Sequence, residues 1–258
     1  MNKMTFFLAF CLFQITWSQN IEISYRVKFR PQKENQLMRI EYSLLKINGL
    51  NSEYIPAKKM NDSLKIDETY LNFIVVQDTS QVKYYGSFND LQFFYHEKPI
   101  NNWVIIPNSA GIHNNYKTQQ AKIQLDGRKW IATFTPDISV SKGPYKFQGL
   151  PGLITEVHSE DQDYSFEMIG LKQTKEEKNL HLENYKKIEK KKLQLYISEF
   201  LKDPASKKLS LKNSYGDTFD YQPTGKKDEN YRSTNAFIFE TFQKYNNPID
   251  KETHILVF

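Results

Sequence analysis

The sequence predicts a mainly β, α+β protein built on a single curved antiparallel sheet or an open half-barrel, with one short helix near residues 193–202. Short β-prone runs recur along the chain, and Asn, Asp, Gly and Pro separate them. The 18 Phe and 16 Tyr residues raise the β-propensity further. Many short strands at close spacing favour antiparallel pairing over βαβ units, and together these observations predict the fold class.

The first expected strand runs from Ile21 to Phe29, where apolar residues occupy every second position and polar residues lie between them. This alternation is typical of a strand with one buried face. Similar runs are found at residues 39–47, 71–77, 81–85, 91–95, 103–106, 121–125 and 130–134.

Tight turns are expected where glycine follows Asn or Asp between two such runs. Asn48-Gly49 and Asp126-Gly127 both suit the left-handed conformations of short hairpin turns. We expect the second pair to join residues 121–125 to residues 129–134 in a hairpin.

A third turn is expected near Pro151 and Gly152, within a segment that concentrates glycine and proline. Proline fixes φ at about −65° and glycine permits positive φ, which predicts a type II turn from Leu150 to Leu153. The residues assigned to this structural turn and its approach are Gly143, Pro144, Gly149, Pro151 and Gly152.

The residues before this turn are expected to form a strand, in which Tyr145 and Phe147 alternate with the polar Lys146 and Gln148. The leucines on either side of the turn either plug the end of an apolar cavity or complete the core. On the first alternative, the candidate ligand contacts are Leu150, Leu153, Tyr145, Phe147 and Trp130.

The last third of the chain has a different composition. Residues 186–192 are rich in lysine and are expected to form a solvated face or a strand edge, with contact to a polyanion as the alternative. Apolar residues then recur at helical spacing up to Asp203-Pro204, which predicts the short helix and its end. Residues 206–233 are polar and rich in turn formers, so we expect a long loop or a flap with marginal strands.

Residues 1–18 have the pattern of a secretory signal peptide: Lys3, an apolar run at residues 6–13, and a small residue, Ser18, at the expected cleavage point. Residues 19–258 are then expected to form a single β-rich domain. The one cysteine, Cys11, lies inside the signal, so the mature chain would have no disulfide and no cysteine nucleophile. No later segment is long and apolar enough for a transmembrane helix.

Sequence motifs identify no catalytic residue. There is no Gly-x-Ser-x-Gly nucleophile elbow, phosphate-binding loop or dinucleotide fingerprint. The five histidines lie at least 17 residues apart, and the best candidate metal set, His158 with Glu160 and Asp161, fits a solvated acidic turn better than a metal site. We therefore predict no metal and no cofactor.

Residues 143–154, Gly-Pro-Tyr-x-Phe-x-Gly-Leu-Pro-Gly-Leu-Ile, resemble the signature of the GLPGLI family of secreted proteins from Bacteroidetes-type bacteria. The segment from Tyr116 to the motif and the residues Asn246-Asn247-Pro248-Ile249 resemble the flanking and closing parts of that family. A Cys-x-Lys-Ala element common in the family is replaced here by residues 118–121. The resemblance implies work in the cell envelope and no assigned activity.

These observations predict a secreted or periplasmic envelope protein, a monomer that binds a ligand or partner on its curved sheet without catalysis. The expected partner is an outer-membrane protein or an apolar ligand, and not a nucleic acid. One alternative is an envelope hydrolase whose site is assembled from residues distant in sequence. Another is an accessory protein of an outer-membrane transport system, because members of the resembled family often accompany such systems.

Overall fold

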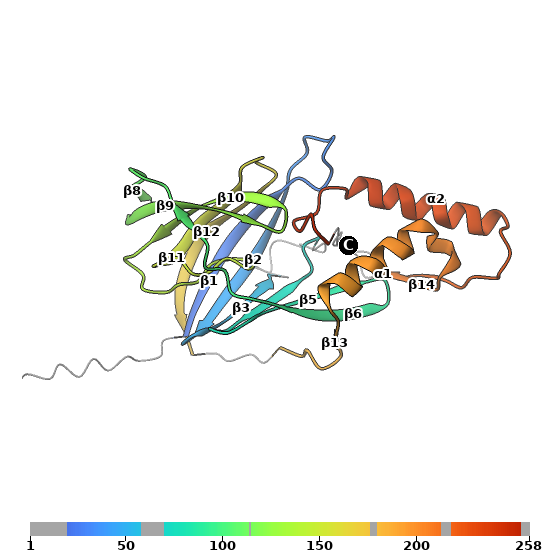
Figure 1. Ribbon diagram of the computed structural model, residues 1–258, viewed down its shortest axis with the longest axis horizontal. Coiled ribbons are helices and arrows are strands. Elements are labelled where there is room, and N and C mark those ends of the chain that lie inside the picture. Colours follow the sequence, from blue (N-terminus) through green and yellow to red (C-terminus); the bar gives the residue numbers. More distant parts are fainter. Residues whose placement is uncertain (1–19, 58–69, 114, 176–179, 213–217, 254–258) are drawn as a thin grey trace, which may run out of the picture.

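The computed structural model describes residues 20–57, 70–113, 115–175, 180–212 and 218–253 (Figure 1). The predicted signal peptide, residues 1–18, lies outside the described residues.

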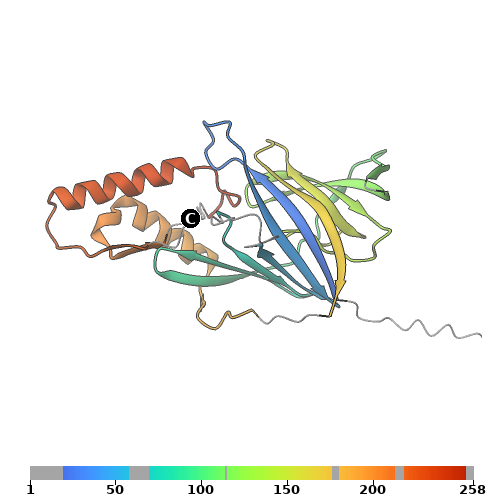
Figure 2. The ribbon, with the colours of Figure 1, turned by 180° about the vertical axis from the view of Figure 1, so that it is seen from behind.

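One 13-stranded sheet dominates the fold, in the order β13-β6-β5-β4-β3-β2-β1-β12-β11-β10-β9-β7, with β8 paired to β9. All of its pairs are antiparallel except that of β13 with β6. Its strands are β1 (Asn20–Phe29), β2 (Arg39–Asn48), β3 (Asn51–Pro56), β4 (Ile74–Gln77), β5 (Val82–Phe88), β6 (Leu91–Glu97), β7 (Val104–Ile105), β8 (Gly111–His113), β9 (Tyr116–Leu125), β10 (Arg128–Thr135), β11 (Leu153–Ser159), β12 (Tyr164–Thr174) and β13 (Lys186–Lys187). The sheet is curved and open, as predicted (Figures 1 and 2).

Strand β1 lies at the middle of this sheet, between β2 and β12. Its alternation is confirmed, because Ile23, Tyr25 and Val27 are buried while the residues between them are partly exposed. The buried side chains of β1 belong to the hydrophobic core that the curved sheet surrounds.

The hairpin predicted at Asp126-Gly127 is confirmed, whereas the tight turn expected at Asn48-Gly49 lies one residue further along the chain. Asn48 pairs with Asn51, which leaves Gly49 and Leu50 as a two-residue turn between β2 and β3. Leu125 pairs with Arg128 in the same way between β9 and β10. At the β9–β10 turn, φ is 52° at Asp126 and 74° at Gly127, so both central residues are left-handed, as a type I′ turn requires.

Two helices lie over the outer end of the β5–β6 hairpin and extend past it (Figures 1 and 2). The predicted helix is α1 (Lys190–Lys202), which begins slightly earlier than expected. Residues 206–233, expected to form a long loop or a flap with marginal strands, do hold two short paired strands, β14 (Leu209–Lys212) and β15 (Thr218–Tyr221). A 3-10 turn (Pro204–Ser206) precedes them, and a second helix, α2 (Glu229–Lys244), follows. That helix was not predicted.

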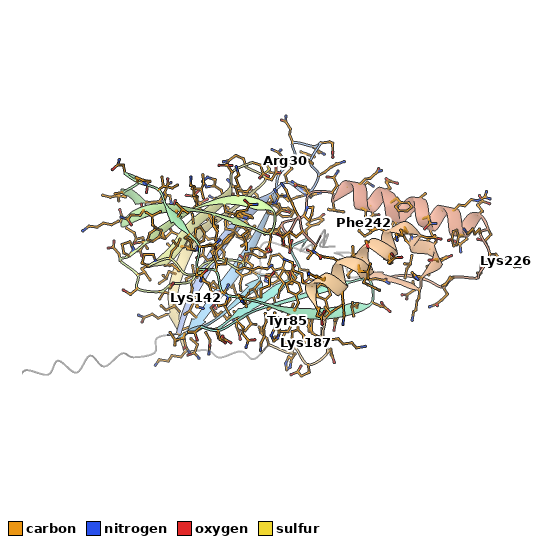
Figure 3. All side chains as sticks on the ribbon, in the orientation of Figure 1. Arg30, Tyr85, Lys142, Lys187, Lys226 and Phe242 are labelled. Carbon is orange, nitrogen blue, oxygen red and sulfur yellow. The ribbon has the colours of Figure 1, made fainter. Side chains whose placement is uncertain are left out.

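Aromatic rings join the helices to the sheet. Phe88 of β5 lies 5.1 Å from Phe200 of α1 and 6.2 Å from Phe242 of α2, measured between ring centroids. Phe242 is labelled on α2 in Figure 3. Buried Leu193 and Ile197 of α1 belong to the same core as the sheet. The helices therefore extend the core of the sheet along its β5–β6 end.

The glycine- and proline-rich segment forms a plug, residues 142–152, that packs on the buried face of the sheet. Phe147 contacts Trp130 of β10 and Phe166 of β12, with ring centroids 5.0 and 6.3 Å away. The backbone carbonyl of Tyr145 accepts a hydrogen bond from Gln77 Nε2 of β4 at 3.0 Å. The plug thus completes the core.

The prediction of a strand at residues 145–148, before the turn, is wrong. Tyr145 has a left-handed φ of 53°, and the Phe147 N–H donates to the Pro144 carbonyl at 3.0 Å, so residues 144–147 form a turn. The expected alternation of buried and exposed side chains is absent, because Lys146 and Gln148 are buried together with the aromatic residues.

The predicted reversal at Pro151-Gly152 is present, but it is not a type II turn. Such a turn would have the Leu153 N–H donate to the Leu150 carbonyl. Here the Gly152 N–H donates to Leu150 at 2.8 Å, and the Leu153 N–H donates to Ile138 at 3.1 Å. Gly152 has a φ of 150°, so the requirement for positive φ is confirmed.

Candidate functional site

The five predicted ligand contacts all lie in the core: Trp130, Tyr145, Phe147, Leu150 and Leu153 are at most 1% exposed. None of the five lines the cleft described next. Ligand contact by these residues stays a prediction, while their packing role is evident from the ring contacts of the plug.

A cleft of about 250 Å³ opens where six segments of the chain meet. They are the start of β5, the end of β6 with the residues after it, the β9–β10 turn, the plug, the start of α1, and a C-terminal strap that we define as residues 246–253. The charged residues that line it are Glu97, Lys98, Asp126, Lys146, Lys190 and Glu252. We call it the ionic cleft.

Lys146 of the plug is 1% exposed and ends at the floor of the ionic cleft. Its ammonium lies 2.7 Å from Glu97 Oε2 and 2.9 Å from Asp126 Oδ2, and it contacts the hydroxyl of Tyr95 at 3.3 Å. The Tyr145 hydroxyl donates to the same Asp126 oxygen at 2.5 Å. The rings of Tyr84, Tyr95 and Tyr145 lie 5.1, 5.3 and 5.2 Å from the ammonium. An aromatic and carboxylate cage therefore holds this cation.

Lys190 is the first residue of α1 and enters the ionic cleft from the opposite side of the shared carboxylates. Its ammonium lies 2.8 Å from Glu97 Oε1 and 3.1 Å from Asp126 Oδ1. It also lies 3.1 Å from Asp250 Oδ2 and 3.4 Å from Glu252 Oε2. Glu97 and Asp126 thus bridge two ammonium groups.

The pKa values of both lysines are raised. Burial by itself would lower the pKa of Lys146, but Asp126 and Glu97 outweigh it. The pKa of Lys190 is lowered by burial and by Lys146, yet the neighbouring carboxylates again raise it above its ordinary value. Both amines are therefore protonated at neutral pH, and neither is a free-amine nucleophile.

The two buried aspartates have pKa values shifted in opposite directions. Burial raises the pKa of Asp126, but the nearby charges of Lys146 and Lys190 lower it by more, so the net pKa lies below its usual range. Burial and the nearby charge of Asp126 raise the pKa of Asp250. Asp250 Oδ1 accepts the backbone N–H groups of Glu252 and Thr253, whereas its Oδ2 accepts no hydrogen bond.

Arg128 of β10 fixes the strap that carries Asp250. Its side chain is fully buried and donates to the Pro248 carbonyl at 2.8 Å and to Asn247 Oδ1 at 2.5 Å. On its other side it pairs with Asp161 at 2.8 Å and with Asp163 at 3.4 Å. The strap is thus held against the sheet at Asn247 and Pro248.

Three carboxylates of the cluster, from Asp126, Asp250 and Glu252, have oxygens within 4.8 Å of one another. The Lys190 ammonium contacts all three, so an ammonium group lies where a metal ion would bind.

The candidate metal set of His158, Glu160 and Asp161, which was not predicted to bind a metal, is not brought together as ligands. His158 Nδ1 lies 3.8 Å from Glu156, and Glu160 pairs with the exposed Lys129. Asp161 pairs with Arg128 instead.

Sequence reasoning missed the ionic cleft. It treated Asp126 as a turn residue, Lys146 as an exposed strand residue and Lys190 as one of several solvated lysines. The neighbours of Lys190 do fit that prediction, since Lys186 and Lys187 form an exposed edge strand. A lysine between the aromatic residues Tyr145 and Phe147, inside a segment rich in glycine and proline, was the available signal.

Fold and site together define a mainly β protein with a mixed-charge cleft at one end of an open sheet. Residues 77–156 match a family model described as "Protein of unknown function (Porph_ging)". That match contains Glu97, Asp126 and Lys146, and it ends before Lys190 and Asp250. Curated proteins give no match.

Among solved structures, the chain is similar to PNGF-II. The crystal form in space group P21 has a TM-score of 0.50 at 14% identity, over 75% of this chain and 34% of that chain. The C2 form has a TM-score of 0.48 at 15% identity, over 66% and 31% of the two chains. The chain therefore spans about a third of the PNGF-II length, and at this identity the likeness concerns the fold alone.

Neither helix in the described part of the chain has the length and apolar character needed to cross a bilayer.

Proposed function

We propose that the protein is exported to the cell envelope and binds a small polar ligand in the ionic cleft, without chemistry on it. The observation that carries this proposal is the buried Lys146 ammonium with its carboxylates at the floor of an open cleft. Taking such charges out of water costs several kcal/mol per ion, and well-packed apolar residues often stabilise a fold equally well. Charges that face a cleft are instead available to a ligand.

The lining favours a polar ligand over the apolar ligand expected from the sequence. Glu97 and Glu252 offer acceptors, and Lys98 and Lys190 offer donors. An apolar ligand would remove water from these groups and return no hydrogen bond, which is unfavourable. Clefts for drug-sized ligands are about 300–1,000 Å³, so a cleft of about 250 Å³ suits a ligand the size of an amino acid or one sugar ring.

Binding is tested with a panel of monosaccharides, amino acids and small amines, measured by calorimetry. Glu252→Gln removes a charge at the partly exposed rim, and we expect it to weaken binding about 10- to 150-fold, because a charge-assisted hydrogen bond is worth about 1.5–3 kcal/mol. Glu160→Gln is the matched control, since Glu160 is exposed and pairs only with Lys129 among the described ion pairs. Equal affinities for both variants would contradict a ligand in the ionic cleft.

Export is supported by the signal-like pattern of residues 1–18, by the absence of cysteine after Cys11, and by the GLPGLI-like motif. We include the protein in that envelope family as part of the proposal. Cell fractionation followed by N-terminal sequencing tests it, with an expected mature start at Gln19. A cytoplasmic protein that retains Met1 would refute export.

One observation favours the hydrolase alternative. Carboxylate oxygens of Asp126 and Asp250 lie within 4.8 Å of each other, and the pKa values of the two groups are shifted in opposite directions, as in pairs that divide the roles of base and acid. Hydrolysis of a glycoside or amide of a panel ligand by the wild type, lost in Asp250→Asn but retained in Glu160→Gln, would establish an enzyme in place of a binding protein. Service to an outer-membrane transport system stays a prediction.

A further inference from the structure

Four carboxylates, from Glu97, Asp126, Asp250 and Glu252, surround the Lys190 ammonium at 2.8 to 3.4 Å. We call them the carboxylate socket. Building on the proposed function, we infer that the socket recognises the primary ammonium group of a ligand, and that Lys190 fills the place of this group when no ligand is bound.

The charge balance of the socket favours a cation. Two ammonium groups, those of Lys146 and Lys190, face its four carboxylates. When Lys190 withdraws, Lys146 alone remains, and the excess of negative charge increases. Asp250 Oδ2 is buried and accepts no hydrogen bond even with the Lys190 ammonium 3.1 Å away, and a ligand ammonium that can orient its three N–H donors freely is suited to supply one.

The two lysines differ in how readily they can leave. The Lys146 side chain is 2% exposed and is enclosed by three tyrosine rings. The Lys190 side chain is 19% exposed and reaches the carboxylates from the open side of the cleft. Lys146 is therefore fixed beside the socket, and Lys190 is the exchangeable occupant.

Apart from the socket carboxylates, the local structure around Lys190 does not stabilise its ammonium at this position. It lies in the first turn of α1, which contains three lysines and no acidic residue. The aligned peptide dipoles make a helix N-terminus positive, so cations there are unfavourable. Glu189 at the N-cap makes no side-chain capping bond. The carboxylates of the socket offset this repulsion. When a ligand ammonium binds these carboxylates, it replaces the Lys190 ammonium there.

An ammonium fits this socket better than a divalent metal ion. Calcium takes six to eight oxygen ligands, and the Lys146 ammonium already engages one oxygen each of Glu97 and Asp126. That fixed positive charge also repels a divalent ion more strongly than a monovalent one. The Tyr95 ring, 5.7 Å from the Lys190 ammonium, adds a surface that attracts organic cations.

The test removes the internal occupant and supplies an external one. Lys190→Ala should bind n-butylammonium about 10- to 150-fold more tightly than the wild type, in which Lys190 competes for the same charge-assisted hydrogen bonds. Tetramethylammonium at equal ionic strength is the control probe, because it has the charge but no N–H donor. Lys191→Ala is the control variant, since Lys191 is exposed on the same turn. We expect it to respond as the wild type does.

Several results would overturn the inference. Equal stabilisation of Lys190→Ala by both cations would show a salt effect only, and equal butylammonium affinity in Lys190→Ala and wild type would remove the competition by Lys190. Should Lys190→Ala not fold alone, refolding with butylammonium and binding by Lys190→Ser decide the matter: recovery or binding supports the socket, and failure of both overturns it.

The outcome for the proposed function is read separately, from the wild type and Glu252→Gln. If the wild-type cleft binds a neutral ligand but Lys190→Ala does not bind butylammonium, the inference about the socket is wrong and the proposed function stands. Butylammonium binding by Lys190→Ala, with no panel ligand bound by the wild type, supports the socket and overturns the proposed function.

Discussion

Alanine at Gly152 tests whether the last turn of the plug has room for any side chain. At the observed φ of 150°, a residue with a Cβ is strained by about 1–3 kcal/mol. An ideal Cβ would also lie 2.1 Å from the carbonyl oxygen of Thr135 and 2.9 Å from Cα of Pro136. Both are backbone atoms and cannot swing away, so overpacking adds about 1–3 kcal/mol. We expect Gly152→Ala to lose about 2–6 kcal/mol of unfolding free energy.

The assay is thermal unfolding followed by circular dichroism. At this chain length 1 kcal/mol shifts Tm by about 2–4 °C, so Gly152→Ala should melt about 4–24 °C below wild type. Gly225→Ala separates the two causes, because Gly225 also has positive φ, 77°, but a Cβ there meets nothing within 4 Å. Gly170→Ala, whose nearest neighbour would be Ser24 Cβ at 4.0 Å, should be nearly neutral. Equal Tm values for Gly152→Ala and Gly225→Ala would refute the steric reasoning.

Three further predictions concern buried charges. Lys146→Met should lower the unfolding free energy measured in urea by about 3–5 kcal/mol, because it leaves Asp126 with one cation fewer. Adding Asp126→Asn to this variant should recover part of the loss. No recovery would contradict the pairing of the two side chains. Burial raises the pKa of Glu41 from 4.5 to about 7, so the folded protein binds this proton more tightly than the unfolded chain. This contribution to the unfolding free energy is complete below pH 4.5 and falls by about 3 kcal/mol as the pH rises to about 7. Glu41→Gln should abolish that loss, measured by urea unfolding at pH 5 and 8. An unchanged pH dependence in this variant would contradict the role of Glu41. Arg128→Met should free the strap and speed proteolysis at residues 246–253, whereas an unchanged cleavage rate would show that other contacts hold it.

The sheet was predictable where local pattern and tertiary environment agree. In β1 the alternation of apolar residues matches the burial of one face, and at Asp126-Gly127 the turn chemistry alone selects a two-residue hairpin. Helix α2 had a weaker signal: Asp228 at its N-cap accepts the Tyr231 N–H, and the buried residues Tyr231, Thr234 and Ile238 follow helical spacing. Polar residues around it hid that spacing.

The ionic cleft was beyond sequence reasoning because its charges come from segments that only the tertiary fold brings together. Asp126 and Lys146 lie 20 positions apart, and Lys190 lies 64 positions from Asp126. Each one, read alone, is an ordinary surface residue, since lysine and aspartate are almost never fully buried without a partner. The partner is visible only once the β9–β10 turn, the plug and the start of α1 converge.

The place of β1 in the sheet has a consequence for how the chain folds. Its neighbour on one side, β2, follows directly, but its neighbour on the other side is β12, where Phe29 pairs with Tyr164. Until β12 has been synthesised and has reached the sheet, the middle strand has one open edge, and such edges recruit strands from other chains. Pairing over so long a loop is also slow. Chains cut before residue 164 should therefore aggregate, and the full chain should need protection for as long as β1 awaits its second partner.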